Sequence, residues 1–336
     1  MPHTDLITTE RPGWQQQLRD AVSSSEQLLE LLQLEPAQVP VAAAAAEQFP
    51  LRVPHSFISR MTVGDANDPL LRQVLAVPEE LVETPGYGSD PVGERGSANP
   101  SPGIIHKYDG RVLLITTGAC AINCRYCFRR HFPYADNQNS RFHWRETLQH
   151  VRDDASISEV ILSGGDPLVA TDRQLAELVG LIAAIPHVQR LRIHSRLPIV
   201  LPDRVTPELV KAICHPRLQT IMVVHSNHAR EIDDTVRAGM ARLQRSGITL
   251  LNQAVLLAGI NDDSDSLAEL CAALFSSGIM PYYLHLLDKV RGAAHFDVPE
   301  SRGLELMHSL SARLPGYMVP RLVREIAGEP GKTRIY

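Results

Sequence analysis

The feature that most restricts the fold is a regular alternation of strand-like and helix-like segments from about residue 107 onward. The strand-like runs are RVLLITT, EVILSG, RLRIHS, QTIMVVHS, TLLNQAVL and PYYLHLL, and they are rich in the aliphatic and β-branched residues typical of strands buried on both faces. The helix-like runs between them are RETLQHVRDD, DRQLAELVGLIAAI, TPELVKAICH, EIDDTVRAGMARLQRSG and SDSLAELCAALFSSG. This order favours an α/β fold with parallel strands, first as a partial (β/α)6-type barrel and second as a doubly wound sheet. In both architectures, functional residues lie at the carboxyl ends of the strands.

The rest of the chain divides by composition into three further segments. Residues 1–83 are predicted to be an N-terminal helical region, because QLLELLQL, VAAAAAEQF and DPLLRQVL have helical patterning. Residues 84–106 are rich in proline, glycine and serine and are predicted to be an irregular connector. The barrel is then expected over 107–290, and a C-terminal segment over 291–336.

Charge and hydropathy limit the class of protein. The formal net charge of −5 argues against nucleic acid held by bulk electrostatics, and no apolar run is long enough to span a bilayer. The first residues, MPHTDLITTERPGW, lack the profile of a secretory signal. We therefore expect a soluble, cytoplasmic protein without nucleic-acid or membrane partners.

Three of the five cysteines follow the strand RVLLITT in the stretch GACAINCRYCFRRHFPY. Cys120, Cys124 and Cys127 have the spacing C-x3-C-x2-C, which in a reducing compartment indicates a metal site rather than disulfides. Three thiolates can hold three irons of a [4Fe–4S] cluster and leave the fourth iron open to a ligand that is not protein. The alternative that remains open is zinc, with His131 as the fourth ligand.

The position of this triplet after the first barrel strand resembles the radical S-adenosylmethionine (radical SAM) superfamily. The resemblance implies that SAM chelates the open iron, and Tyr126 stands at the aromatic position before the third cysteine. The segment LSGGDP, at the end of the second strand, is similar to the one that receives the methionine ammonium of SAM. Later strand ends, in HSRLP, VHSNH and LLNQAVL, offer further contacts. The implied SAM-binding residues are Tyr126, Gly164, Gly165, Asp166, Ser195, His225 and Gln253.

Two segments narrow the resemblance to the lysine 2,3-aminomutase family, whose members also use pyridoxal 5′-phosphate (PLP). CRYCFRRHFPY resembles the family's cysteine loop, which implies that Arg129 binds the substrate carboxylate as a bidentate pair. GEPGKTRIY resembles the segment whose lysine forms a Schiff base with PLP, here Lys332. Without the resemblance, Arg129 would face acidic surface and Lys332 would belong to a solvated tail.

The same resemblance assigns the remaining site residues. HKYDGR, before the first predicted strand, matches the phosphate side of the PLP site and provides Lys107, Tyr108 and Arg111. Asp288 and Glu325 match the pair that binds the distal ammonium of lysine, although well-known members have aspartate where this chain has Glu325. Local pairs are the alternatives, of Asp288 with Lys289 or Arg291 and of Glu325 with Arg324 or Arg321.

The implied activity is migration of the amino group of L-lysine between carbons 2 and 3. The sequence ends soon after Lys332, where longer aminomutases continue into a cysteine-rich zinc-binding tail. In this it resembles the short bacterial form that makes (R)-β-lysine for translation elongation factor P, which implies an electron donor and a functional link to an elongation factor P ligase. The alternatives are a radical SAM enzyme without PLP acting on another substrate, and a structural or electron-transfer iron–sulfur protein.

Overall fold

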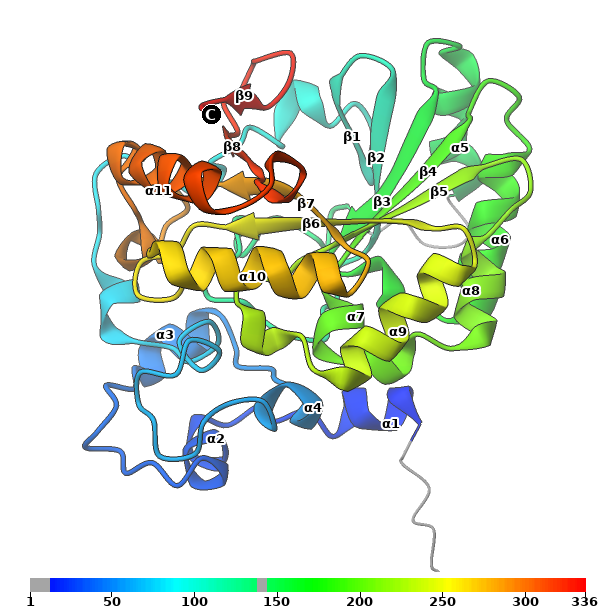
Figure 1. Cartoon of the computed structure of the whole chain (residues 1–336). Coiled ribbons are helices and arrows are strands. Elements are labelled where there is room, and N and C mark those ends of the chain that lie inside the picture. Colours follow the sequence, from blue (N-terminus) through cyan, green and yellow to red (C-terminus); the bar gives the residue numbers. More distant parts are fainter. Residues whose placement is uncertain (1–12, 138–143) are drawn as a thin grey trace, which may run out of the picture.

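One mixed sheet organises the fold, as a computed structural model describes it for residues 13–137 and 144–336. Seven neighbouring strands are parallel, and one antiparallel strand is added at each edge. Because the two antiparallel strands stand at opposite edges and do not pair, the sheet is an open, partial barrel, which confirms the predicted α/β class (Figure 1). In chain order the strands are β1 (Ile104–Tyr108), β2 (Arg111–Thr117), β3 (Glu159–Gly164), β4 (Arg190–Ser195), β5 (Gln219–Val224), β6 (Thr249–Val255), β7 (Met280–His285), β8 (Arg321–Arg324) and β9 (Thr333–Arg334).

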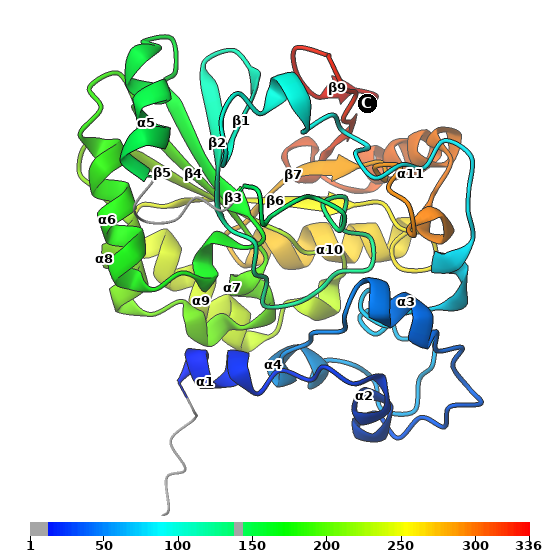
Figure 2. The same cartoon turned by 180° about the vertical axis from the view of Figure 1, so that it is seen from behind.

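Helices follow the parallel strands and cover the outer face of the sheet (Figures 1 and 2). The five predicted helices are confirmed, and polar side chains begin several of them, as where Thr171 and Gln174 form a capping box. None of the described helices is long and apolar enough to cross a membrane. The helices are α5 (Trp144–Asp153), α6 (Asp172–Ala183), α7 (Leu197–Val200), α8 (Pro207–Ile213), α9 (Asp234–Arg245), α10 (Ser264–Ser276) and α11 (Glu300–Arg313). Short 3-10 helices are η3 (Pro167–Val169), η4 (Pro202–Arg204), η5 (Ala229–Glu231), η6 (Ala294–Phe296) and η7 (Gly316–Met318).

The N-terminal region gathers at one end of the barrel (Figure 1). Its described part contains α1 (Trp14–Arg19), α2 (Ser25–Leu31), α3 (Ala43–Gln48), α4 (His55–Ile58) and η1 (Pro78–Leu81). The helices expected in QLLELLQL and VAAAAAEQF are present, but the helix expected in DPLLRQVL is wrong, because that stretch forms successive turns. The buried carboxylate of Asp68 accepts from the backbone of Thr62, Leu70 and Leu71 and pairs with Arg230, and these tertiary contacts hold the turns. Residues 1–12 of the predicted region lie outside the described part.

The predicted connector is irregular only as far as residue 103, apart from η2 (Gly96–Ala98). The HKY of HKYDGR belongs to β1, which turns at Gly110 and pairs antiparallel with β2, so the expectation that this stretch precedes the first strand is wrong. The sheet likewise continues past residue 290 through β8 and β9. These short edge strands lack the long alternation that identifies the other six.

Inward-facing polar residues leave the barrel incompletely filled. Along β4 and β6, half-buried residues alternate with buried ones, as the period of a strand requires. The half-buried positions Arg192, His194, Gln253 and Val255 line a cavity, whereas Leu191 and Ile193 pack into the core. Polar side chains at inward positions therefore create a site inside the sheet.

Candidate active site

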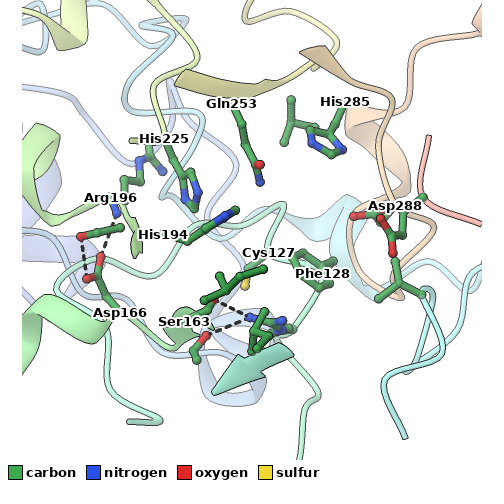
Figure 3. A pocket seen from close by; sticks show the side chains of 18 of the residues that line it. Cys127, Phe128, Ser163, Asp166, His194, Arg196, His225, Gln253, His285 and Asp288 are labelled. Atoms are coloured by element: carbon green, nitrogen blue, oxygen red, sulfur yellow. Dashed lines mark hydrogen bonds between the residues drawn. The ribbon is translucent and has the colours of Figure 1, made fainter. Parts of the chain in front are cut away.

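One cavity of about 450 Å³ runs along the inside of the sheet, a size typical of small-molecule sites. Side chains from β1 to β7 and the loops after them form its wall, and Figure 3 shows His194, His225, Gln253, His285 and Asp288 pointing into it. The cavity brings together nearly all of the residues predicted from the sequence, and Gly165 alone is absent from its lining. Those in the wall are Lys107, Tyr108, Arg111, Cys120, Cys124, Tyr126, Cys127, Arg129, Gly164, Asp166, Ser195, His225, Gln253, Asp288, Glu325 and Lys332.

The cysteine loop, residues 118–134, is anchored to the N-terminal region by a buried ion pair. The guanidinium of Arg125 has no solvent exposure, and it meets Glu80 through two hydrogen bonds of 2.8 and 2.6 Å. Arg125 also donates to the carbonyl oxygens of Phe49 and Ala45, and Arg130 pairs with the same Glu80 at 2.8 Å. A buried charge without its partner is costly. The N-terminal region therefore holds the loop that carries the three cysteines.

The three thiols are half-buried and free, and they line the cavity. Burial, with a contribution from Cys124, raises the pKa of Cys127 to about 11, and burial also raises that of Cys120. A bound iron reverses this balance, because a coordinated thiol is deprotonated. A bound group that carries positive charge would therefore stabilise the three cysteines as thiolates.

The zinc alternative has less support from the geometry. Across residues 13–137 and 144–336, no three His, Cys, Asp or Glu side chains are grouped closely enough to bind one metal ion. A [4Fe–4S] cluster does not require its ligands to converge on one ion, because each thiolate binds a separate iron. His131, the proposed fourth zinc ligand, lies outside the cavity wall with its Nε2 3.2 Å from the carbonyl oxygen of Arg291.

The glycines of the GGDP segment allow the loop after β3 to pack against the cysteine loop. Gly164 has a φ of +126°, and a Cβ there would lie 2.5 Å from the carbonyl oxygen of Thr117. A Cβ on Gly165 would lie 2.3 Å from the carbonyl oxygen of Ala119. Gly165 N–H and Asp166 N–H donate to those same two oxygens, at 2.7 and 2.8 Å. These glycines are needed for contact between two protein loops, as well as for any approach of a ligand.

We expect Gly165→Ala to disturb the cysteine loop because its methyl group would overlap the backbone at Ala119. The predicted result is loss of most of the iron that the purified, reconstituted protein retains. Iron and sulfide assays measure this, with Gly180→Ala as the control, because the space around Gly180 on α6 is open. Unchanged iron content in Gly165→Ala would show that the loop tolerates displacement.

Asp166 connects the loop after β3 to the end of β4. Its carboxylate accepts from the hydroxyl of Ser195 at 2.7 Å, from the backbone N–H of Arg196 at 2.8 Å, and from Leu168 and Leu197, both at 3.0 Å (Figure 3). Four protein donors occupy both of its oxygens. In this structure Asp166 and Ser195 therefore position two strand ends against each other, and their predicted contact with SAM remains a prediction.

Arg129 is buried beside the cysteines, not on an acidic surface. Its Nε and Nη2 meet the carboxylate of Glu94 at 2.6 and 2.7 Å, and its Nη1 donates to Ser163 Oγ at 2.9 Å. Nη1 also donates to the carbonyl oxygen of Gly164 at 3.5 Å, so a substrate carboxylate would have to use the remaining N–H of Nη2 or displace one of these partners. Sequence reasoning missed Glu94, which lies in the irregular connector.

Glu325 lies in the cavity wall, between two lysines. Its carboxylate is 2.9 Å from Lys332 Nζ and 2.6 Å from Lys107 Nζ, and it also accepts from the hydroxyl of Tyr108. Burial raises the pKa of Glu325, but Lys332, Lys107 and Tyr108 outweigh burial and lower that pKa to about 2. The local pair proposed with Arg324 is wrong, because Arg324 pairs with Glu300 at 2.8 Å. Lys332 is held in the cavity wall and is not a solvated tail.

Buried atoms without a hydrogen-bond partner occur on several polar side chains in the wall, among them Nε2 of His194, His225 and His285 and Oδ1 of Asp288. Burial lowers the pKa of His225 to about 3 and those of the other two histidines well below their ordinary value, so the three imidazoles are neutral. Burial raises the pKa of Asp288 to about 7, against the effect of Lys332. Among the described residues, neither Lys289 nor Arg291 forms an ion pair with Asp288. Unpartnered buried polar atoms indicate a missing ligand.

Comparison with known proteins identifies the family. An L-lysine 2,3-aminomutase of Escherichia coli (strain K12) is 50% identical, over 98% of this chain and 96% of that protein. The chain belongs to the radical SAM lysine 2,3-aminomutase family. The enzyme of the same name from Haemophilus influenzae is 46% identical over 99% of this chain and 98% of its own length, and that of Clostridium subterminale is 33% identical over 98% and 79%.

Two further comparisons concern parts of the chain. Residues 109–190, which include the cysteine loop and GGDP, match the model of a 4Fe-4S single cluster domain. The crystal structure of a radical SAM methyltransferase from Sphaerobacter thermophilus superposes on this chain with a TM-score of 0.46 and 15% sequence identity. The match covers 69% of this chain and 73% of the methyltransferase.

The residues present fit the three groups that this family implies, which are a [4Fe–4S] cluster, SAM and PLP. Three free thiols, the amine of Lys332, and unpartnered histidine and aspartate atoms all line the one cavity. The cavity also contains Arg192 and His194, which sequence reasoning missed although both occupy inward positions of a correctly predicted strand.

Proposed function

We propose that this chain is a PLP-dependent radical SAM isomerase that converts L-α-lysine to (R)-β-lysine by 2,3-amino migration. The observation that carries the proposal is that one cavity is lined by the cysteine triplet and also by Lys332, Glu325 and Asp288. When bound, the cluster with SAM supplies a radical that can break an unactivated C–H bond, and PLP supplies a covalent hold on the migrating nitrogen.

In this proposal the protein's own residues bind and orient. Cys120, Cys124 and Cys127 hold the cluster, and the guanidinium of Arg129 receives the lysine carboxylate. Asp288 receives the distal ammonium, because its buried Oδ1 has no partner and a buried ammonium needs one. Because Arg129 and Asp288 hold the two ends of the lysine, they determine which of its hydrogens faces the radical.

The other predicted contacts extend the same site. Lys332 provides the amine that attaches PLP, while Lys107, Tyr108 and Arg111 lie nearby on β1 and β2 for its phosphate side. Since Lys107 and Tyr108 also hold Glu325, we infer that Glu325 organises the PLP end as well as contributing to ammonium binding. Tyr126, Gly164, His225 and Gln253 line the same cavity and are the proposed contacts to SAM.

The proposal also concerns the biological setting. We propose a cytoplasmic enzyme, since free thiols and a reduced cluster require a reducing compartment. An electron donor must reduce the cluster, and the product is proposed to pass to a ligase that modifies elongation factor P. The support for this is the near full-length similarity to aminomutases of comparable length.

An anaerobic assay tests the proposed reaction. Reconstituted protein is incubated with PLP, SAM, dithionite and L-lysine, and the amino acids are separated by chiral chromatography with mass detection. We expect (R)-β-lysine. Formation of 5′-deoxyadenosine with unchanged lysine would favour a radical SAM enzyme for another substrate, and absence of both with a verified cluster would favour a structural or electron-transfer protein. The (S) product would contradict the proposed link to elongation factor P.

The raised pKa of Asp288 predicts that lysine binding depends on pH. Only the deprotonated carboxylate binds an ammonium well, so a pKa of about 7 means that affinity rises from pH 6 to pH 8, by about tenfold. Titration calorimetry on the holoenzyme measures this, with norleucine, which lacks the distal ammonium, as the control ligand. An equal pH dependence for norleucine, or its persistence in Asp288→Asn, would remove Asp288 from the ammonium site.

A further inference from the structure

We propose that Arg196, which the proposed reaction does not use, is a positioning residue that sets the reduction potential of the cluster. Its Nη1 donates to Cys124 Sγ at 2.7 Å, across 72 positions of sequence. The inference rests on the proposed ligation of iron by Cys124 and goes beyond it, because it concerns which redox state of the cluster the protein favours.

Arg196 is held rigidly at this sulfur. The loop after β4 carries it, and its backbone N–H is bound by the carboxylate of Asp166 (Figure 3). Its Nη2 donates to Gln73 Oε1 at 2.7 Å and to Glu231 Oε2 at 3.1 Å. Its guanidinium carbon lies 5.4 Å from the centre of the Phe57 ring and 5.6 Å from that of Tyr126. With only 5% of its surface exposed, the side chain has little freedom to leave the sulfur.

The contact between Arg196 and Cys124 predicts the direction in which the reduction potential of the cluster is shifted. One-electron reduction adds negative charge to the cluster and its thiolates. A positive charge and an N–H···S hydrogen bond stabilise that more negative state, and hydrogen bonds to the sulfurs and local charge are among the factors that set cluster potentials. In a buried site the interaction is weakly screened by solvent. Arg196 should therefore make the cluster easier to reduce.

Glu231, which accepts from Nη2 of Arg196, reduces the effect of Arg196 on the reduction potential. Its side chain is fully buried, and its Oε1 accepts from the N–H groups of Asn227 and His228 and from Gln73 Nε2. Arg60, a further cation, donates to the backbone carbonyl of Glu231. The carboxylate partly neutralises Arg196, so removal of its charge should change the potential in the direction opposite to removal of Arg196.

The test is an EPR-monitored redox titration of the reconstituted protein without SAM, with dithionite as reductant and dye mediators. For Arg196→Gln we expect a reduction equilibrium constant lower by about tenfold, which corresponds to about 59 mV for one electron. For Glu231→Gln we expect a shift to higher potential. Arg196→Lys keeps the positive charge but loses the planar guanidinium. Its reduction potential should lie between those of Arg196→Gln and the unaltered protein. The matched control is Arg245→Gln, which removes an exposed charge on α9 and should leave the potential unchanged.

The outcomes separate this inference from the proposed function. A cluster-loaded Arg196→Gln protein with the original potential overturns the inference, and a change only in SAM affinity would instead make Arg196 a ligand of SAM. If Arg196→Gln loses its cluster, the reduction potentials of Glu231→Gln and Arg196→Lys provide the test. The inference fails if neither potential differs from that of the unaltered protein. Failure of the unaltered protein to bind any cluster would refute the proposed iron ligation itself.

Discussion

Replacing Lys332 with alanine is expected to reduce aminomutase turnover by more than about a thousandfold, because the cavity would lose the amine proposed to attach PLP. The structure aims this side chain at the site. Lys332 immediately precedes β9, and the N–H groups of Ile335 and Tyr336 donate to the carbonyl oxygen of Leu322 at 2.9 and 3.3 Å. Tyr336 further pairs with Ser311 of α11 at 2.8 Å. The segment is therefore fixed on the C-terminal side of Lys332.

Borohydride reduction of the PLP-loaded protein followed by peptide mass analysis measures this directly. PLP should be found on Lys332 in the unaltered protein and be absent from this peptide in Lys332→Ala, while iron content and the cluster spectrum stay the same. Lys211→Ala, which removes an exposed lysine on α8, is the control. Stable attachment of PLP with normal turnover in Lys332→Ala would refute the assignment and revive the alternative without PLP.

Replacing Cys124 with alanine is expected to remove the cluster and bring turnover to background, a loss of more than about a thousandfold. Two thiolates remain, but the third iron loses its ligand and Arg196 loses the sulfur to which it donates. PLP binding should persist, because Lys332 pairs with Glu325, which is held by Lys107 and Tyr108.

Iron and sulfide assays, the visible spectrum of the cluster and the yield of 5′-deoxyadenosine measure the result. The matched control is Cys214→Ala, since Cys214 ends α8 and does not line the cavity. We expect that control to retain iron and activity. Full iron occupancy in Cys124→Ala, or loss of iron only in the Cys214 variant, would place the cluster elsewhere.

Much of the fold was predictable because its long parallel strands and the helices between them carry their own periodicity. The strands RVLLITT, EVILSG and RLRIHS have the bounds that their patterns indicate. DPLLRQVL shows the limit of such reasoning, since its apolar pattern suits a helix but Asp68 is held in turns by Arg230 and by backbone donors. The short strands β8 and β9 are recognisable only once a neighbouring strand pairs with them.

The same contrast holds for the site. By itself the sequence determined the cysteine spacing and the strand ends where a site must lie, because these depend on residue type and local order. The candidate lysine and acids came from the resemblance to the aminomutase family. Only the tertiary structure decided that Arg129 meets Glu94, that Arg125 meets Glu80, that Glu325 joins Lys107 to Lys332, and that Arg196 reaches Cys124. A buried charge must find a partner, but residues far apart in sequence become that partner only when packing brings them together.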